Sequence, residues 1–361
     1  MNFMMKNSTQ KTLPMIAVVK EQPTIGFSLV RTTISTDLAP DEVLIQVSTA
    51  SFCGTDTHIY EYNPWAQSRL HLPLIVGHEL SGTIIKLGKK VTTLKIGDCV
   101  SAESHITCGT CEFCLRGEGH ICENTKIIGV DTQGCFANYV KIPAKNCYVL
   151  PSHFNPKLLS VLEPLGNAVH TMTHFEVKDK AVAIVGCGPI GIMGVDVVLA
   201  LGARKVIAIE VKAYRRELAA KIGAHVVIDP LQEDVVQRIL DETGGKGVDV
   251  VGEFSGNVGA INQAFKYIKA GGGMSLLGLP SKPIEIDLSH QIIYKGLRLY
   301  GVTGRRLPET WNQVFSLLPC LHLDQIITHE LPFRQVNEAG ELMRSGQCGK
   351  IILIPEEVTH E

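Results

Sequence analysis

Four cysteines gathered in one short stretch have the spacing of a metal site. Cys108, Cys111 and Cys114 are each separated by two residues, and Cys122 follows after seven more. Four thiolates can surround a tetrahedral zinc ion, and a metal with all four positions filled is structural. An iron–sulfur cluster is the alternative, but ferredoxin motifs continue with a shorter spacing and a proline, whereas Glu123 follows here. The pattern therefore favours a structural zinc lobe at residues 105–123.

A second set of potential ligands is dispersed along the chain: Cys53, His78, Glu79 and Glu163. A thiolate, an imidazole and carboxylates together suit zinc. A site with three protein ligands keeps one position open for water or substrate, as catalytic zinc sites do. From the residues alone this set is only a candidate, because a single cysteine in a loop and a single histidine are more often structural.

A glycine pattern typical of phosphate binding follows an apolar strand and opens a helix. Gly186, Gly188 and Gly191 form a G-x-G-x-x-G. The first glycine makes the tight turn, the second lets the backbone approach a pyrophosphate, and the third lets helix pack on strand. The phosphates would then sit on the free N–H groups of the helix N-terminus. A glycine turn in a nucleotide-free α/β domain is the alternative.

One carboxylate indicates which dinucleotide is bound. Glu210 ends the next strand, 19 residues after Gly191. An acid there accepts hydrogen bonds from the adenosine ribose and repels a 2′-phosphate, which favours NAD over NADP. Nearby basic residues that could accept a phosphate weaken this preference: Lys212, Arg215 and Arg216.

The elements around the glycine pattern alternate between strand and helix. Apolar runs are expected to form strands at 181–185, 205–209, 225–228, 248–253 and 274–278, with helices at 189–201, 214–221, 234–242 and 258–269. Such alternation predicts a parallel sheet covered on both faces. Residues 15 to about 150 are instead β-rich and irregular, with short runs such as 42–48. The fold class is therefore α/β with a β-rich second domain.

Bulk composition is that of a globular enzyme. The chain has 361 residues, of which 45% are hydrophobic and 19% are charged, and its formal net charge is −2. This balance argues against a nucleic acid or a membrane as partner. No apolar run approaches the ~20 residues of a membrane span. Residues 1–14 lack the apolar core of a signal peptide, so we expect a disordered leader and a cytoplasmic protein.

Taken together, these motifs resemble the zinc-containing medium-chain dehydrogenase/reductase family. The resemblance covers nearly the whole chain after residue 15 and rests on 53–58, 77–79, the four-cysteine lobe, 186–191 and Glu210. It implies a chaperonin-10-like catalytic domain formed by 15–165 and 303–361, around a Rossmann domain at 166–302. It also implies two zinc ions per chain and a homotetramer.

The resemblance assigns roles position by position. Cys53, His78 and Glu79 match ligands of a catalytic zinc, and Glu163 matches an acid that either ligates or transfers protons. Thr55 and His58 match a proton relay; the alternatives are a helix cap near Asp56 and a surface histidine. The positions that match cofactor contacts are Gly186, Gly188, Ile190, Gly191, Glu210, Arg215, Leu277, Gly278, Leu279, Val302 and Thr303.

Within this family the chain resembles the members that oxidise the 3-hydroxyl of L-threonine to 2-amino-3-oxobutanoate. The stretches that carry this resemblance are 55–60, 65–67, 105–109, 163–170, 304–306, 309–311, 327–329 and 343–346. Polyol and 2,3-butanediol dehydrogenases share the same chemistry and are the alternative. His105 is either a substrate contact or a loop histidine, and His170 and His174 are expected to pack rather than to bind metal.

Overall fold

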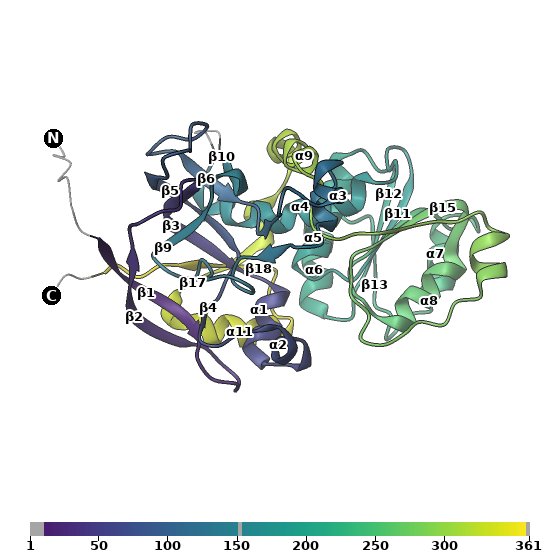
Figure 1. Ribbon diagram of the computed structural model, residues 1–361. Coiled ribbons are helices and arrows are strands. Elements are labelled where there is room, and N and C mark those ends of the chain that lie inside the picture. The colour runs from purple at the N-terminus through teal and green to yellow at the C-terminus, as the bar shows by residue number, and fades with distance from the viewer. Residues whose placement is uncertain (1–10, 151–153, 359–361) are drawn as a thin grey trace.

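The computed structural model describes residues 11–150 and 154–358. Figure 1 shows a β-rich half beside a half in which helices cover a sheet, with α4 and α5 between them. Within the described ranges no helix has the length and apolar character needed to cross a membrane.

The β-rich half is built on a mostly antiparallel sheet in the order β10-β6-β5-β3-β18-β17, with β9 also paired to β3. Strand β3 is central because it pairs with β5, β9 and β18, and most of its side chains are buried. Its end carries the chain to Cys53. The strands of this half are β1 (Thr12–Lys20), β2 (Ser28–Ser35), β3 (Glu42–Phe52), β4 (Leu74–Ile75), β5 (Glu79–Leu87), β6 (Cys99–Ala102), β7 (His105–Ile106), β8 (Lys126–Ile127), β9 (Tyr139–Pro143) and β10 (Cys147–Val149). Its helices are α1 (Gly54–Glu61), α2 (Pro64–Arg69) and α3 (Glu112–Leu115), with the 3-10 turns η1 (Gly119–Ile121) and η2 (Ala144–Asn146).

The C-terminal segment returns to this half. Strand β18 (Lys350–Ile354) pairs antiparallel with β3, and β17 (Ile327–Pro332) pairs parallel with β18. Helix α11 (Val336–Ser345) packs against α1. These pairings place β17 and β18 in the main sheet of the β-rich half, and the exact division into domains stays a prediction.

The other half is a parallel sheet in the order β13-β12-β11-β14-β15-β16. This is the doubly wound dinucleotide-binding order, with its switch point between β11 and β14. Its strands are β11 (Ala181–Val185), β12 (Lys205–Ile209), β13 (Val226–Ile228), β14 (Val248–Glu253), β15 (Ile268–Leu276) and β16 (Arg298–Gly301). The remaining helices are η3 (Pro156–Val161), α4 (Leu162–Thr173), α5 (Pro189–Ala200), α6 (Ala213–Ile222), α7 (Val235–Glu242), α8 (Val258–Tyr267), η4 (Leu288–Ile293), α9 (Glu309–Leu317), η5 (Leu318–Cys320), α10 (Leu323–Ile326) and η6 (Phe333–Gln335).

Helices α4 and α9 join the two halves. Helix α4 packs on both α5 and α9, so the proposed boundary at 165/166 falls inside a continuous helix. The Trp311 ring of α9 stacks on Tyr148 of β10, with ring centroids 4.2 Å apart. This contact brings the segment after β16 against the β-rich half.

The prediction that residues 1–14 form a disordered leader is wrong for residues 12–14, which belong to a strand. Strand β1 begins at Thr12, and Leu13 and Pro14 pair with Ile34 and Thr33 of β2, because the partner strand extends far enough to receive them. Residues 1–10 lie outside the described residues.

Candidate active site and metal centres

The dispersed ligand set comes together at the end of β3 and the start of β5. One ligand atom from each of Cys53, His78 and Glu79 lies within 4.8 Å of the other two. Cys53 is the N-cap residue of α1, and its backbone N–H donates to Asp56 Oδ2 at 2.9 Å. Gly77, at φ +89°, makes the turn before His78, and a Cβ there would lie 2.1 Å from Phe136. The turn that presents His78 and Glu79 therefore requires glycine.

The donor set fits a metal cation. Glu79 is fully buried, yet among the described residues its Oε1 has no hydrogen-bond partner, whereas His78 Nδ1 lies 3.7 Å from Asp56 Oδ1. Buried polar atoms are normally satisfied, so Glu79 Oε1 indicates a missing partner. A thiolate, an imidazole and a carboxylate are ligands that zinc accepts in tetrahedral geometry.

Negative charge dominates the surroundings of the set. Burial lowers the pKa of His78, but the acidic groups Asp56, Cys53 and Glu163 outweigh it and raise this pKa to about 10. Burial raises the pKa of the Asp56 carboxyl to about 6, against the opposing effect of His78. A bound cation would relieve this excess of acidic groups.

Two residues that orient Glu79 could not be found from spacing. Its Oε2 accepts from Ser51 Oγ and pairs with the Lys350 ammonium, which also donates to the Phe52 carbonyl at 2.9 Å. Lys350 is 1% exposed and begins the apolar strand β18. A lysine opening an apolar run was the only signal for it in the sequence. These contacts hold Oε2 and leave Oε1 without a partner among the described residues.

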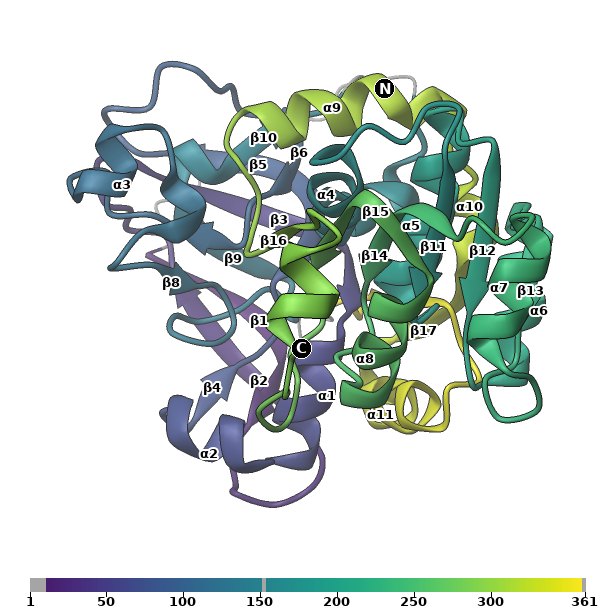
Figure 2. The same ribbon diagram turned by 90° about the vertical axis from the view of Figure 1, so that its right-hand side faces the viewer.

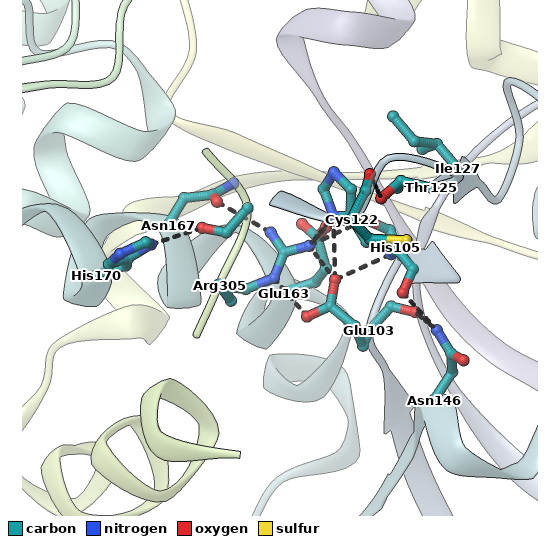
Figure 3. A network of polar contacts seen from close by, with 12 residues as sticks. Glu103, His105, Cys122, Thr125, Ile127, Asn146, Glu163, Asn167, His170 and Arg305 are labelled. Atoms are coloured by element: carbon teal, nitrogen blue, oxygen red, sulfur yellow. Dashed lines mark hydrogen bonds and ion pairs between the residues drawn. The ribbon is translucent and has the colours of Figure 1, made fainter. Parts of the chain in front are cut away.

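Glu163 lies in a different group, with Glu103 and His105. Its Oε1 lies 2.7 Å from Arg305 Nη2 and accepts from Ser104 Oγ. Arg305 also donates from Nε to Glu103 Oε2 (Figure 3). Trp311 Nε1 donates to the same oxygen at 3.1 Å. Because Glu163 is paired with a guanidinium while Glu79 Oε1 is free, the geometry favours Glu79 as the metal ligand.

The four cysteines of the lobe also converge. The sulfurs of Cys108, Cys111, Cys114 and Cys122 lie within 4.8 Å of one another, and none forms a disulfide. Backbone N–H groups of Cys111 and Thr110 point at Cys108 Sγ from 3.3 and 3.4 Å. Hydrogen bonds from Thr110 and Cys111 lower the pKa of the Cys108 thiol to about 5, which favours the thiolate that binds metal. Figure 2 shows α3, which carries Cys114, at the edge of the molecule, away from the parallel sheet.

A cavity of about 430 Å³ lies at the carboxyl ends of β11, β12 and β14. Gly186 and Glu210 line it, together with Ser255 and Asn257. Ligands bind at this edge of doubly wound sheets. Glu210 Oε2 accepts from the Cys187 N–H at 2.8 Å and its Oε1 from the Lys212 N–H at 2.9 Å, which fixes the carboxylate at the rim.

The basic residues after Glu210 are mostly occupied. Arg216 Nη2 pairs with Asp229 at 2.8 Å, and its Nη1 donates to the carbonyls of Glu210 and Val211. Arg215 Nε donates to the Cys348 carbonyl at 3.2 Å, and Nη1 lies beside Gly188. The Arg216 guanidinium is therefore taken up by protein acceptors, whereas Arg215 Nη1 faces the glycine loop.

The glycines of the loop differ in how much space an added side chain would find. Alanine variants at Gly191 and Gly188 should therefore separate an effect on stability from an effect on cofactor binding. A Cβ on Gly191 would lie 1.9 Å from the Gly186 carbonyl, whereas one on Gly188 would meet only Arg215 Nη1 at 3.7 Å. We expect Gly191→Ala to lose about 1–3 kcal/mol of stability. Gly188→Ala should keep wild-type stability and bind NADH at least about tenfold more weakly, because the methyl group occupies pyrophosphate space. Denaturant unfolding measures the stability, and fluorescence titration measures the NADH affinity. Unchanged NADH affinity in Gly188→Ala would contradict the assignment of this loop to pyrophosphate binding.

Two segments that match cofactor contacts, residues 277–279 and residues 302–303, are neighbours. The N–H groups of Leu277 and Gly278 donate to the Glu253 carbonyl, and the Val302 N–H donates to the Leu276 carbonyl at 2.9 Å. Leu279 is 90% exposed and Thr303 is exposed beside buried Val302. Their contact with a cofactor, like that of Ile190, stays a prediction.

Thr55 and His58 lie on α1, one turn apart. The alternative that Thr55 caps this helix is wrong, since the N-cap is Cys53. His58 is exposed and its Nδ1 lies 2.9 Å from Asn63 Nδ2. In the part of the chain that the structure describes, the two side chains make no hydrogen bond with each other, so the relay stays a prediction.

His170 and His174 pack, as their spacing suggested. His170 Nδ1 lies 2.8 Å from the Gly304 carbonyl and Nε2 lies 2.9 Å from the Tyr300 hydroxyl. The His174 ring stacks on Tyr300 with centroids 3.4 Å apart. These contacts join the end of α4 to β16 and to Gly304 after it, and neither histidine belongs to a candidate metal set among the described residues.

A doubly wound nucleotide domain joined to a β-rich domain with a three-ligand set defines a class of enzyme. Residues 39–152 match the GroES-like domain of alcohol dehydrogenases, and residues 189–319 match the zinc-binding dehydrogenase domain. The chain belongs to the zinc-binding dehydrogenase family, of the alcohol dehydrogenase type. The family and the fold class predicted from the sequence are thereby confirmed.

Individual proteins of this family are similar to the chain over nearly its whole length. L-threonine 3-dehydrogenase of Caldanaerobacter subterraneus is 48% identical over 94% of this chain and 99% of its own length. The enzyme of the same name from Bacillus velezensis is 47% identical over the same shares. Among solved structures, alcohol dehydrogenase TADH from Thermus sp. ATN1 superposes with a TM-score of 0.86 at 27% identity, covering 94% of this chain and 99% of that one.

Proposed function

We propose that the chain oxidises the 3-hydroxyl of L-threonine to 2-amino-3-oxobutanoate, with zinc as catalytic metal and hydride transfer to NAD. The observation that carries the reaction class is the buried set Cys53, His78 and Glu79, in which Glu79 Oε1 has no partner among the described residues. Likeness to L-threonine 3-dehydrogenases over nearly the whole chain supports the substrate.

Each residue of the site has a role in this reaction. When bound, zinc polarises the substrate hydroxyl and lowers its pKa, and NAD accepts the hydride. Cys53, His78 and Glu79 would hold the metal, with Lys350 and Ser51 fixing the orientation of Glu79. Second-sphere partners of this kind tune metal affinity.

The proposal also assigns residues to cofactor binding, to proton transfer and to the structural zinc. Glu210 would accept hydrogen bonds from the adenosine ribose, and the free N–H groups at the start of α5 would receive the pyrophosphate. Thr55 and His58 are proposed to pass a proton outward, since a hydroxyl both donates and accepts and imidazole titrates near neutrality. Cys108, Cys111, Cys114 and Cys122 would hold a second, structural zinc.

Initial rates of NADH formation test the substrate. Purified, zinc-loaded protein would be given L-threonine, sorbitol and 2,3-butanediol at equal concentration. The proposal expects a clear preference for L-threonine. Activity on the diols alone would keep the zinc chemistry and discard L-threonine, in favour of the polyol or butanediol alternative.

The number of zinc ions bound per chain distinguishes a zinc-dependent dehydrogenase from a non-catalytic relative and from a zinc-free reductase. Two zinc ions per chain fit the dehydrogenase, one fits a non-catalytic relative that keeps only the lobe, and none fits a zinc-free reductase. The open three-ligand set argues against both of the latter, because a protein without metal chemistry has no use for it.

We also propose that the chain forms a homo-oligomer, with a homotetramer expected from its family. Strand β16 is the outer strand of the parallel sheet, and apolar side chains near it are exposed: Leu288, Ile293, Tyr294 and Leu299. An uncovered edge with apolar neighbours is normally protected by a partner. Light scattering should give four times the chain mass, whereas a monomer at micromolar concentration would contradict the proposal. The cytoplasmic location stays a prediction.

A further inference from the structure

Strand β1 ends in a buried lysine, Lys20, whose side chain is 0% exposed. Its Nζ donates to the carbonyls of Gly26 and Tyr60 at 3.0 Å each, and also to the carbonyl of Thr24. Burial is the only influence on the pKa of Lys20, which it lowers to about 8, so no carboxylate among the described residues pairs with it. At neutral pH this lysine is therefore a buried cation that only neutral groups surround.

The surroundings of Lys20 have the chemistry of a monovalent cation site. An ammonium has three hydrogens to donate, and three carbonyl oxygens are there to accept them. The rings of Phe27 and Tyr62 also face it, with Nζ 5.6 and 5.5 Å from their centroids. Aromatic faces attract cations at such distances. We call the carbonyls of Thr24, Gly26 and Tyr60 the carbonyl cage, and Lys20 fills it as a tethered cation.

One carbonyl of the cage belongs to the last turn of α1. The final carbonyls of a helix have no partner within the helix, and the macrodipole favours a cation at this end. The Tyr60 carbonyl accepts from Lys20 Nζ and from the Gly26 N–H, at 3.0 Å each. The other two carbonyls belong to the loop between β1 and β2. The ammonium therefore fastens this loop to the end of α1.

The loop is itself anchored on a second helix, α11. Asn337 Oδ1 accepts from the Phe27 N–H at 2.8 Å, and Asn337 Nδ2 donates to the Phe27 carbonyl at 3.1 Å. Helix α11 lies beside α1 (Figure 1), and a Cβ on Gly340 would lie 2.8 Å from the Tyr60 ring. Because the loop is held by α11, Lys20 fixes the backbone at the end of α1 against a firm support.

The opposite end of α1 carries a proposed metal ligand. Cys53 is the N-cap residue, and its carbonyl accepts from the Thr57 N–H at 3.3 Å while its own N–H donates to Asp56 Oδ2 at 2.9 Å. The helix has eight residues and a length of about 12 Å, so its two turns move as one unit. A displacement at Tyr60 is therefore passed on to the Cys53 thiol.

We propose that Lys20 is a positioning residue for the metal set: as a tethered cation in the carbonyl cage, it fixes the end of α1 and thereby the place of Cys53. This inference rests on the proposed catalytic zinc site. Loss of the ammonium should weaken the hold on that ion. It should spare the ion of the four-cysteine lobe, whose ligands lie at residues 108–122 and outside α1.

Release of zinc to a colorimetric chelator, from zinc-loaded protein without cofactor, tests this role. Wild type should show two phases, and the phase missing from Cys53→Ser belongs to the metal set. In Lys20→Met we expect that phase to be about tenfold faster, at the lower end of the effect of residues behind a ligand, and the lobe phase unchanged. Lys295→Met is the matched control, because Lys295 Nζ also donates to two carbonyls, those of Phe265 and Ile268, but in the nucleotide half. Both phases should keep their wild-type rates in it.

Chemical rescue distinguishes a cation site from general support of the fold. Lys20→Ala removes three methylene groups and the ammonium, and propylammonium supplies the same heavy atoms. Propylammonium should restore slow release from the metal set in Lys20→Ala, whereas tetramethylammonium, a cation without N–H donors, should not. Rescue by neither cation, or by both alike, would overturn the cation role. Should Lys20→Met not fold, Lys20→Ala purified in propylammonium decides the question.

The outcomes separate this role from its premise. A wild-type protein that holds only the lobe ion would refute the proposed catalytic zinc site itself. With two ions in wild type, an unchanged metal-set phase in Lys20→Met would overturn the role of Lys20 and leave the oxidation intact. Equal acceleration of both phases would overturn it as well, because Lys20 would then support the fold as a whole.

Discussion

Replacing Cys53 with serine should abolish turnover and leave the nucleotide site intact. The thiolate is the softest of the three proposed ligands, and a serine hydroxyl is a poor substitute for it at zinc. Loss of a Lewis acid that supplies several kcal/mol corresponds to a fall in kcat of roughly 10³–10⁴-fold. NADH affinity should not change, because Cys53 lies at the end of β3 and the cavity lined by Gly186 and Glu210 lies at the parallel sheet.

Metal analysis and fluorescence titration accompany the kinetics. Cys53→Ser should retain the lobe metal and lose the other, so that its zinc content halves. Cys320→Ser is the matched control, since that thiol is exposed and belongs to neither set, and it should behave as wild type. Full activity in Cys53→Ser, or retention of both ions, would refute the assigned ligand.

Replacing Arg305 with methionine should destabilise the protein strongly. The substitution keeps an apolar stem but leaves the buried carboxylates of Glu103 and Glu163 without their cation. Breaking one side of a buried ion pair costs about 3–5 kcal/mol in the free energy of unfolding. Arg306→Met is the control, because that side chain is 47% exposed and lies 3.7 Å from Glu309. It should change stability by no more than about 0.5 kcal/mol.

The deficit of Arg305→Met should depend on pH. In wild type the depressed pKa of Glu103 stabilises the fold above the unfolded-state pKa of about 4.3, and this stabilisation is lost as pH falls through the folded-state pKa. Without Arg305, burial raises the pKa of Glu103, so the folded variant takes up a proton more readily than the unfolded chain. Urea unfolding should therefore show a gap from wild type that is largest at neutral pH and narrows towards pH ~5. A constant gap would mean that Glu103 is not the group paired with Arg305.

The nucleotide half could be predicted closely because its signal is local. Strands β11, β12 and β14 begin and end at the expected residues, since both faces of a parallel sheet are buried and each strand is a continuous apolar run. Strand β15 was expected at 274–278 but spans Ile268–Leu276. Its start contains Gly271, Gly272 and Gly273, which have no side chain to mark a strand.

The ligand sets were predictable as residue types, but not as groupings. Spacing alone could not decide whether Glu79 or Glu163 belongs with Cys53 and His78, because the choice depends on where β5 and α4 lie. Arg305 pairs with Glu163, which favours Glu79 as the ligand, and Arg305 stands 202 positions from its other partner, Glu103. Contacts of that sequence separation follow from the topology, which returns the segment after β16 to the β-rich half, and no local pattern encodes them.

Deuterium transfer tests the central claim most directly. L-Threonine labelled with deuterium at C3 would be incubated with NAD and either zinc-loaded or zinc-depleted protein, and the reduced cofactor analysed by mass spectrometry. The account predicts one deuterium in each cofactor molecule formed, a primary isotope effect when hydride transfer limits the rate, and no transfer without zinc. Reduced cofactor free of deuterium, or equal transfer by the zinc-depleted protein, would contradict zinc-dependent hydride transfer from C3.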